Sequence, residues 1–141
     1  QLCFRLYNCS KQITRLYAPL LTKLQLTYPQ YLVMLVLWQQ YEQDQKAVSV
    51  TSVGEALDLE SGTLSPLLKR MEKLGVLARN RSLLDERVVE VSLTTQGKSL
   101  QEKACDIPAR LMAQTNADPA KIKLLNNALD ELLLSLSKVS A

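Results

Sequence analysis

The chain of 141 residues contains no histidine, only three cysteines and only 5% aromatic residues. Because Cys3, Cys9 and Cys105 are scattered and no histidine can join them, a structural zinc site is disfavoured, and we expect no metal or other cofactor. Few aromatic residues among many leucines favour packed helices over a β-sandwich or barrel. The longest apolar run, from Tyr31 to Trp38, is far too short to cross a bilayer, so we expect no membrane partner.

The cysteine count also bears on the cellular compartment. Three is an odd number, which does not suit a set of structural disulfides. Arg5 interrupts the apolar residues near the N-terminus, so this region lacks the layout of a signal peptide. We therefore expect a reducing, cytoplasmic compartment.

Charge is unevenly distributed along a chain that is otherwise ordinary for a globular protein, with 47% hydrophobic and 22% charged residues. The formal net charge is +3, and the segment from Lys69 to Arg87 holds six basic and three acidic residues, an excess of three. This short segment therefore carries a charge equal to that of the whole chain, a distribution that permits nucleic-acid binding.

The N-terminal third of the sequence predicts two helices. Apolar residues at helical spacing indicate a helix over residues 2–24. Thr27, with Gln30 three residues later, has the pattern of a capping box and opens a second helix that runs to about residue 40. The polar stretch 41–47 is predicted to be a loop.

The middle of the chain predicts a helix, a short turn and a second helix. Ser49 or Thr51 caps the first of these helices, which ends at Leu57. Ser61 begins the second, which ends at residue 74, and Gly75 stands where a left-handed C-cap residue belongs.

A β-hairpin and two further helices are expected after residue 75. Two short runs, over 76–82 and 88–93, are interpreted as β-strands on either side of a polar turn, which predicts the hairpin. A helix over about 95–114, interrupted at Pro108, and a last helix that begins at Asp118 and Pro119 follow it. The expected fold is mainly α with a small β-wing, a winged helix-turn-helix.

The helix that begins at Ser61 has two distinct faces. An apolar stripe at helical spacing, expected to face the core, consists of Leu64, Leu67, Leu68, Met71 and Leu74. The other side carries small and hydroxyl residues near its N-terminus and cations further along: Ser61, Gly62, Thr63, Ser65, Pro66, Lys69, Arg70 and Lys73. The first group suits base edges in the major groove, and the second suits phosphates.

The hairpin decides how this basic helix face is interpreted. By itself, a basic helix face is more often a solvent-exposed surface than a DNA-binding one. Here Arg79 and Arg81 lie on the first strand, and Asp85 and Arg87 at the tip. An arginine on a hairpin beside a recognition helix can enter the narrow minor groove, where the potential is most negative. We therefore predict that the partner is double-stranded DNA.

Four segments resemble the MarR family of transcriptional regulators. LESGTLSPLLKRME, from Leu59 to Glu72, is similar to that family's recognition helix, and Asp85-Glu86-Arg87 matches its wing signature. Leu2-Cys3-Phe4 and LTYPQY, from Leu26 to Tyr31, are similar to its organic-hydroperoxide-sensing branch, the OhrR-type repressors. The segments keep the family's order and spacing over nearly the whole chain.

This resemblance implies a single MarR-type domain over 1–141. It places a winged helix-turn-helix at about 27–94 and dimerisation helices at about 1–25 and 95–141. The last helix supplies the leucines expected to pair with a partner's first helix: Leu124, Leu125, Leu129, Leu132, Leu133 and Leu136. A homodimer would place two recognition helices on a pseudo-palindromic operator, roughly 34 Å apart.

The resemblance also assigns a sensor. Cys3 matches the cysteine that reacts with organic hydroperoxides, and Tyr17 and Tyr28 match the tyrosines that hydrogen-bond to it. Cys3 and Tyr17 are separated by roughly 21 Å along a straight helix, so they cannot meet within one. Either the helix folds back or the partner subunit supplies the tyrosine, and we favour the partner. Cys9 faces another side of the helix and is predicted to be a packing residue.

Cys105 is a candidate resolving cysteine. In some members of the branch a second cysteine in the penultimate helix forms an intersubunit disulfide with the sensor. In others, a small thiol captures the sensor cysteine or it is over-oxidised. Cys105 lies in the appropriate helix, and Pro108 is expected to weaken that helix and ease a rearrangement.

Two other functions compete with this interpretation. A MarR-type regulator could instead be released by a small phenolic or amphipathic ligand at the dimer interface, with Cys3 a bystander. A thiol peroxidase could use an activated cysteine, but the chain lacks a catalytic base and such chemistry leaves the basic face unexplained. We therefore expect a regulator and not an enzyme.

Overall fold

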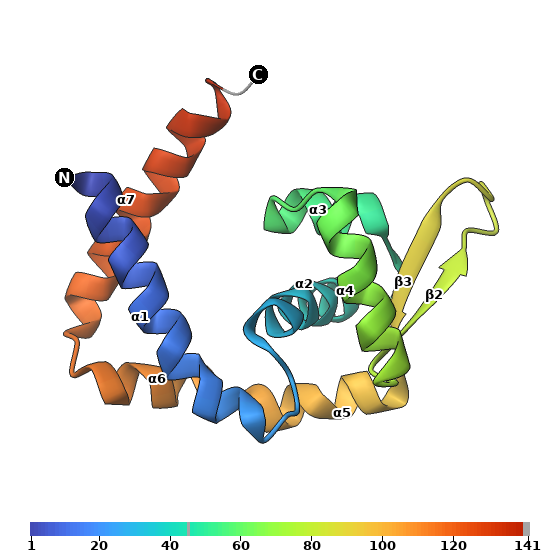
Figure 1. Ribbon diagram of the computed structural model, residues 1–141, viewed down its shortest axis with the longest axis horizontal. Coiled ribbons are helices and arrows are strands. Elements are labelled where there is room, and N and C mark those ends of the chain that lie inside the picture. The colour runs from blue at the N-terminus through green and yellow to red at the C-terminus, as the bar shows by residue number, and fades with distance from the viewer. Residues whose placement is uncertain (45, 140–141) are drawn as a thin grey trace. The chain divides into compact units, whose positions relative to one another are not determined.

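The computed structural model describes residues 1–44 and 46–139, which form two compact units, Gln1–Cys105 and Asp106–Ala141. The described chain is mainly helical with one small antiparallel sheet, as predicted (Figure 1). Among the described residues, no helix is both long and apolar enough to cross a membrane.

Helices α1 (Leu2–Thr22) and α2 (Tyr28–Asp44) open the first unit. The predicted capping box is confirmed: the Thr27 N–H donates to Gln30 Oε1 at 2.9 Å, and the Gln30 N–H donates to Thr27 Oγ1 at 3.5 Å. Residues 41–44, predicted to be loop, instead continue α2. Tertiary contacts explain this extension of the helix: the Tyr41 ring centroid lies 4.2 Å from the Lys98 ammonium, and Glu42 accepts a hydrogen bond from Gln101. Position 45 of the predicted loop lies outside the described residues.

The predicted helix-turn-helix is confirmed as α3 (Val50–Leu57) and α4 (Ser61–Lys73). Ser49 is the N-cap of α3, and its hydroxyl accepts the Ser52 N–H at 3.1 Å. Gly75 has a φ of +75°. The N–H groups of Gly75 and Val76 close the end of α4 on the carbonyls of Glu72 and Met71. This arrangement is a Schellman motif, which needs the left-handed glycine.

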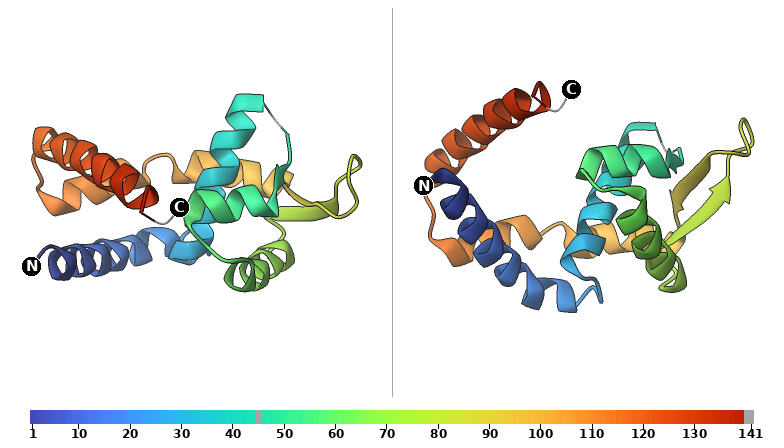
Figure 2. Two further views of the ribbon diagram at one scale, coloured as in Figure 1. Left: turned by 90° about the horizontal axis from the view of Figure 1, so that it is seen from above. Right: turned by 45° about the horizontal axis from the view of Figure 1, so that its top comes forward.

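The sheet has three strands in the order β1-β3-β2, all antiparallel. The hairpin of β2 (Leu77–Arg81) and β3 (Val89–Leu93) was predicted, and Arg79 pairs with Val91 in its register. The two-residue strand β1 (Val48–Ser49) was missed because it forms only by pairing with β3, about forty positions away in the sequence. In both views of Figure 2 the hairpin projects from the helices of its unit.

The core of the first unit lies where α2, α3, α4 and the sheet meet. Its most buried large side chains belong to these elements and to the end of α1: Leu21, Tyr31, Val33, Met34, Val53, Leu64, Leu68, Met71, Leu77 and Val91. Helix α5 (Thr95–Ala104) closes this core. It approaches so closely that a Cβ on Gly97 would lie 1.9 Å from the carbonyl oxygen of Val76.

The second unit consists of α6 (Ile107–Thr115) and α7 (Pro119–Ser137). The predicted helix over 95–114 is broken, but the break falls at Cys105 and Asp106 and not at Pro108, which occupies the first turn of α6 where a proline is tolerated. Asp118 caps α7 by accepting the Ala120 N–H at 2.9 Å, as predicted. In α7, every residue of which is described, none is buried.

Candidate functional site

Helix α4 presents the two faces that its sequence predicts. Leu64, Leu67, Leu68 and Met71 are buried, whereas Leu74, predicted to complete the stripe, is exposed because the chain turns away at Gly75. All eight residues of the predicted polar face are exposed: Ser61, Gly62, Thr63, Ser65, Pro66, Lys69, Arg70 and Lys73. The helix therefore presents an uninterrupted polar face that ends in cations.

Arg79 connects α4 to β2. Its Nε and one terminal nitrogen donate to Glu72 Oε2 at 3.1 and 2.9 Å, and its backbone N–H donates to Glu72 Oε1 at 3.0 Å. This paired guanidinium acts as a brace that holds the hairpin against α4. The DNA contact expected of Arg79 stays a prediction, and the observed geometry gives it a positioning role.

The brace predicts a pH-dependent contribution to stability. The hydrogen bonds donated by Arg79, first from its side chain and then from its backbone, hold the pKa of Glu72 below its usual value. A lowered pKa in the folded state stabilises at neutral pH, and this contribution is lost as the pH falls through that pKa. Glu72→Gln should therefore lower the melting temperature at pH 7, and the difference from the native protein should shrink on acidification. Glu86→Gln is the matched control, and an equal decrease in both variants would contradict the brace.

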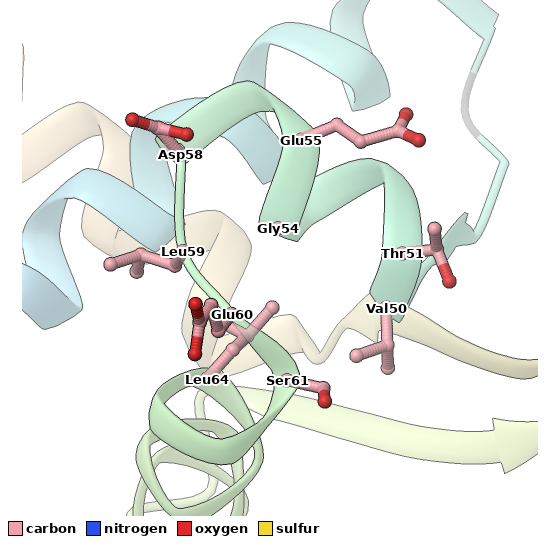
Figure 3. A pocket seen from close by; sticks show the side chains of 9 residues that line it. All are labelled: Val50, Thr51, Gly54, Glu55, Asp58, Leu59, Glu60, Ser61 and Leu64. Carbon is pink, nitrogen blue, oxygen red and sulfur yellow. The ribbon is translucent and has the colours of Figure 1, made fainter. Parts of the chain in front are cut away.

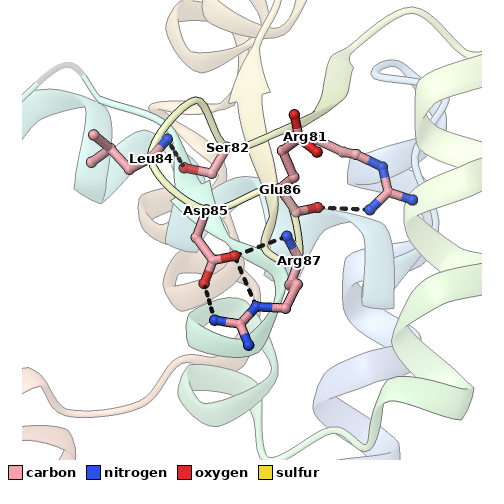
Figure 4. A network of polar contacts seen from close by, with 6 residues as sticks. All are labelled: Arg81, Ser82, Leu84, Asp85, Glu86 and Arg87. Carbon is pink, nitrogen blue, oxygen red and sulfur yellow. Dashed lines mark hydrogen bonds and ion pairs between the residues drawn. The ribbon is translucent and has the colours of Figure 1, made fainter.

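The hairpin tip is held by its own polar contacts (Figure 4). Arg87 donates to both oxygens of Asp85 at 3.1 Å, and its backbone N–H donates to Asp85 Oδ1 at 3.0 Å. Arg81 donates to the Glu86 carbonyl at 2.7 Å. The Arg87 side chain nevertheless stays 90% exposed, so the carboxylate orients a guanidinium that remains available to a partner.

A pocket of about 340 Å³ lies at the turn between α3 and α4 (Figure 3). Glu55, Asp58 and Glu60 are among its lining residues, which makes it unsuited to a phosphate. The carboxylates of Glu55 and Asp58 point away from each other, so they do not converge on a cation. No group of three potential metal ligands occurs among the described residues.

Tyr17 and Tyr28, the two predicted sensor tyrosines, lie together in an aromatic cluster. Their ring centroids are 5.0 Å apart, and Tyr31 lies 5.6 Å from Tyr17. Burial, followed by the neighbouring tyrosines, raises the pKa of Tyr31 to about 12, and burial, followed by Tyr28, raises the pKa of Tyr17. Both shifts lead away from the physiological range, so the hydroxyl of Tyr17 keeps its proton there and is able to donate it to an anion.

Cys3 lies at the far end of α1 from this cluster. It is exposed in the first turn of a helix that continues unbroken through Thr22, so one chain does not bring Cys3 and Tyr17 together. The N-terminal half of α1 stands away from the rest of its unit (Figures 1 and 2). Cys9, predicted to be a packing residue, is exposed instead.

Cys105 is the C-cap residue of α5, at the boundary between the two units. It is exposed, and its thiol donates to the Glu102 carbonyl at 3.0 Å, a weak contact for a sulfur donor. It therefore lies at a joint between helices, where little helical hydrogen bonding would have to break for the thiol to move.

Sequence reasoning missed three residues that support the site. Tyr31 completes the tyrosine cluster, and its spacing of three from Tyr28 could have indicated a shared helix face. Trp38 extends the cluster, with its ring 6.2 Å from Tyr31, and donates to the Gly97 carbonyl at 2.9 Å. The pairing of Glu72 with Arg79 had no sequence signal, because it joins a helix to a strand.

Comparison with known proteins places these features in a family. Residues 15–104 match the family described as transcriptional regulator SarA/Rot. The organic hydroperoxide resistance transcriptional regulator of Bacillus subtilis is 47% identical over 136 residues, covering 96% of this chain and 89% of that protein.

Solved structures give the same picture. AbfR of Staphylococcus epidermidis is 34% identical with a TM-score of 0.80, covering 98% of this chain and 92% of that one. AbfR structures include a reduced, DNA-bound form and a disulfide form. A MarR variant from E. coli with operator DNA has a TM-score of 0.82 at 21% identity, covering 94% and 93%, and so supports the fold alone.

The chain therefore belongs to the SarA/Rot family of transcriptional regulators. It is a regulator similar to OhrR and not an enzyme, which confirms the resemblance found in the sequence.

Proposed function

We propose that the chain binds operator DNA as a homodimer and releases it when an organic hydroperoxide oxidises Cys3. The DNA-binding part rests chiefly on the exposed polar face of α4 beside an arginine-bearing wing. In this proposal the small and hydroxyl residues approach base edges: Ser61, Gly62, Thr63, Ser65 and Pro66. The cations contact phosphates or the minor groove, namely Lys69, Arg70, Lys73, Arg81 and Arg87, and Asp85 orients Arg87. The compartment of such a bacterial regulator is the cytoplasm.

Exposed apolar side chains at both ends of the chain support the homodimer. Leu2, Phe4 and Tyr7 on α1 are 59–69% exposed, and Leu124 and Leu133 on α7 are 69% and 63% exposed. Apolar area of this extent is costly in water, and a second copy of the same surface would cover it. A dimer would present two copies of α4 to successive major-groove faces.

The dimer would also complete the sensor. Since α1 separates Cys3 from Tyr17 in one chain, the tyrosines that donate to the Cys3 thiolate come from the partner subunit. Burial, followed by Tyr28, raises the pKa of Tyr17 still further above the physiological range, so its hydroxyl keeps the proton that it would donate. Such donors stabilise a thiolate without supplying positive charge, which suits a chain with no histidine.

The chemistry has two steps. The Cys3 thiolate attacks the terminal oxygen of the hydroperoxide; the O–O bond breaks, the alkoxide leaves as an alcohol after taking up a proton, and Cys3 becomes a sulfenic acid. The thiolate of Cys105 from the partner then attacks the Cys3 sulfur; an S–S bond forms, the S–O bond breaks, and the oxygen leaves as hydroxide that takes up a proton to become water. Over the two steps Cys3 and Cys105 together lose two electrons and the peroxide gains two.

DNA release would follow from geometry. A disulfide holds its two Cα atoms within roughly 7 Å of each other, and in this proposal the joint at Cys105 moves toward the partner's α1 to reach that distance. This movement shifts the two recognition helices away from the operator spacing. When only one recognition helix can bind at a time, the second no longer adds to the affinity. The apparent affinity for the operator then falls by a factor of about 10²–10⁴.

A mobility-shift experiment tests the proposal. The reduced protein first selects a duplex from a random-sequence DNA pool, and that selected duplex is titrated with and without stoichiometric cumene hydroperoxide. We expect binding by the reduced protein and release after oxidation. Failure to select any duplex would rule out DNA binding. Equal binding with and without peroxide would rule out control of DNA binding by oxidation of Cys3.

Cys105→Ser tests the resolving step separately. The variant should bind the selected duplex like the native protein and react with peroxide, but it should form no dimer-sized band on a non-reducing gel. Its release should be weaker and should depend on added small thiol. If Cys105→Ser releases DNA fully without any thiol, then a Cys3–Cys105 disulfide is not the switch.

One observation favours the ligand-gated alternative. A mainly apolar pocket of about 490 Å³ lies between the start of α2 and α4, lined by Thr27, Pro29, Gln30, Leu59, Thr63, Leu67 and Arg70. The Arg70 guanidinium could pair with a carboxylate there. Release of the selected duplex by salicylate, equally in native protein and Cys3→Ser, would establish this alternative.

A further inference from the structure

Two adjacent leucines stand uncovered at the tip of the wing. Leu83 and Leu84 have relative solvent exposures of 101% and 98%. These are the highest values among the large apolar residues that the structure describes. Neighbouring leucines at a loop tip lower solubility unless a partner covers them. They therefore indicate a contact surface.

The loop that carries these leucines is well defined. The Ser82 N–H donates to the Val88 carbonyl at 2.8 Å, and the Val88 N–H donates to the Asp85 carbonyl at 2.9 Å. The buried Ser82 hydroxyl accepts the Leu84 N–H at 3.3 Å. The two leucines are thus presented on a loop whose backbone is fixed on both sides.

Two arginines lie on or beside the loop that carries this apolar tip, together with Asp85 and Glu86. Arg87 is oriented by Asp85, and Arg81 is held on the Glu86 carbonyl, with Leu84 on the opposite side of the loop from Arg81 (Figure 4). The Arg87 guanidinium, oriented by Asp85 and 90% exposed, lies on the same loop as the two leucines. An apolar tip that also carries an exposed guanidinium suits the minor groove, whose walls are sugars and whose potential is negative. Because the Glu72–Arg79 pair fixes the hairpin to α4, the tip would reach the duplex together with the recognition helix.

We propose that Leu83 and Leu84 form an apolar wedge that enters the minor groove beside each half-site. The wedge opens a base step, so it favours operators with an easily deformed pyrimidine–purine step beneath the wing. This inference rests on the proposed DNA-binding function. It has a distinctive consequence: a contact made by leucines releases no counterions, so it strengthens binding without changing the salt dependence.

The test compares three variants by fluorescence anisotropy on the selected duplex over a range of salt concentrations. Replacing both leucines with serine should weaken binding about tenfold or more with the salt slope unchanged. Replacing both with methionine, which keeps the apolar volume, should restore most of the affinity. Arg87→Ala should weaken binding and lower the salt slope by about one for each phosphate that the arginine neutralises.

A second readout follows the base step. With 2-aminopurine placed beneath the wing, the native protein should raise its fluorescence by unstacking it, and the serine variant should not. If the native protein selects a duplex and the serine variant binds it equally well, the wedge is wrong and the proposed function stands. If no duplex is selected, both fail. Leucine-dependent binding to anionic phospholipid vesicles with unchanged DNA affinity would instead assign the tip to a membrane.

Discussion

Replacing Cys3 with serine should leave reduced-state DNA binding unchanged and abolish release by organic hydroperoxide. The hydroxyl of serine is nearly isosteric with the thiol but cannot be oxidised to a sulfenic acid. For the native protein, oxidation should lower the apparent affinity for the selected duplex by about 10²–10⁴-fold, because only one of the two recognition helices can then bind its half-site. Anisotropy titrations before and after one equivalent of cumene hydroperoxide measure both quantities.

Cys9→Ser is the matched control, since Cys9 lies on the same helix and is also exposed. It should respond to peroxide like the native protein. If Cys3→Ser still releases DNA and Cys9→Ser does not, then the sensor has been assigned to the wrong thiol.

The second large effect is expected at Gly97. A Cβ at this position would lie 1.9 Å from the Val76 carbonyl oxygen and 3.2 Å from Leu93 Cδ2, so either α5 or the turn before β2 must shift to admit it. The Gly97 carbonyl also accepts the indole N–H of Trp38. Gly97→Ala should therefore lower the free energy of unfolding by about 3 kcal/mol or more, measured by urea titration of Trp38 fluorescence.

Gly62→Ala provides the contrast within the same chain. No atom lies within 4 Å of a Cβ at Gly62, and alanine is the better helix former, so this variant should be as stable as the native protein or up to about 1 kcal/mol more stable. It should nevertheless bind the selected duplex more weakly, because we place Gly62 against the DNA. If Gly97→Ala were as stable as Gly62→Ala, the close approach of α5 would be wrong.

Local chemistry explains why so much of the fold could be predicted. The apolar stripe of α4 from Leu64 to Met71 has a period that only a helix satisfies, and Gly75 supplies the left-handed residue that ends it. The Thr27–Gln30 box depends on residues three apart. Each of these signals lies within one turn or one face, so the sequence displays it directly.

Features that depend on distant partners could not be predicted in the same way. The last turn of α2 forms where Tyr41 meets Lys98, and β1 exists only as a partner of β3. Arg79 had the right charge for DNA but is paired across elements with Glu72. Leu83 and Leu84 fall in the turn that the sequence predicts, but their almost complete exposure depends on how the hairpin is placed and is seen only in the structure.

A mixed dimer tests most directly whether the two subunits build the sensor together. One protomer carries Cys3→Ser, its partner carries Tyr17→Phe and Tyr28→Phe, and the heterodimer is purified through two different tags. Its single Cys3 should react with cumene hydroperoxide at the native rate, since it faces the intact tyrosines of the other subunit. A rate no faster than that of the double-phenylalanine homodimer would show that Cys3 uses the tyrosines of its own chain, and it would contradict a sensor built by the dimer.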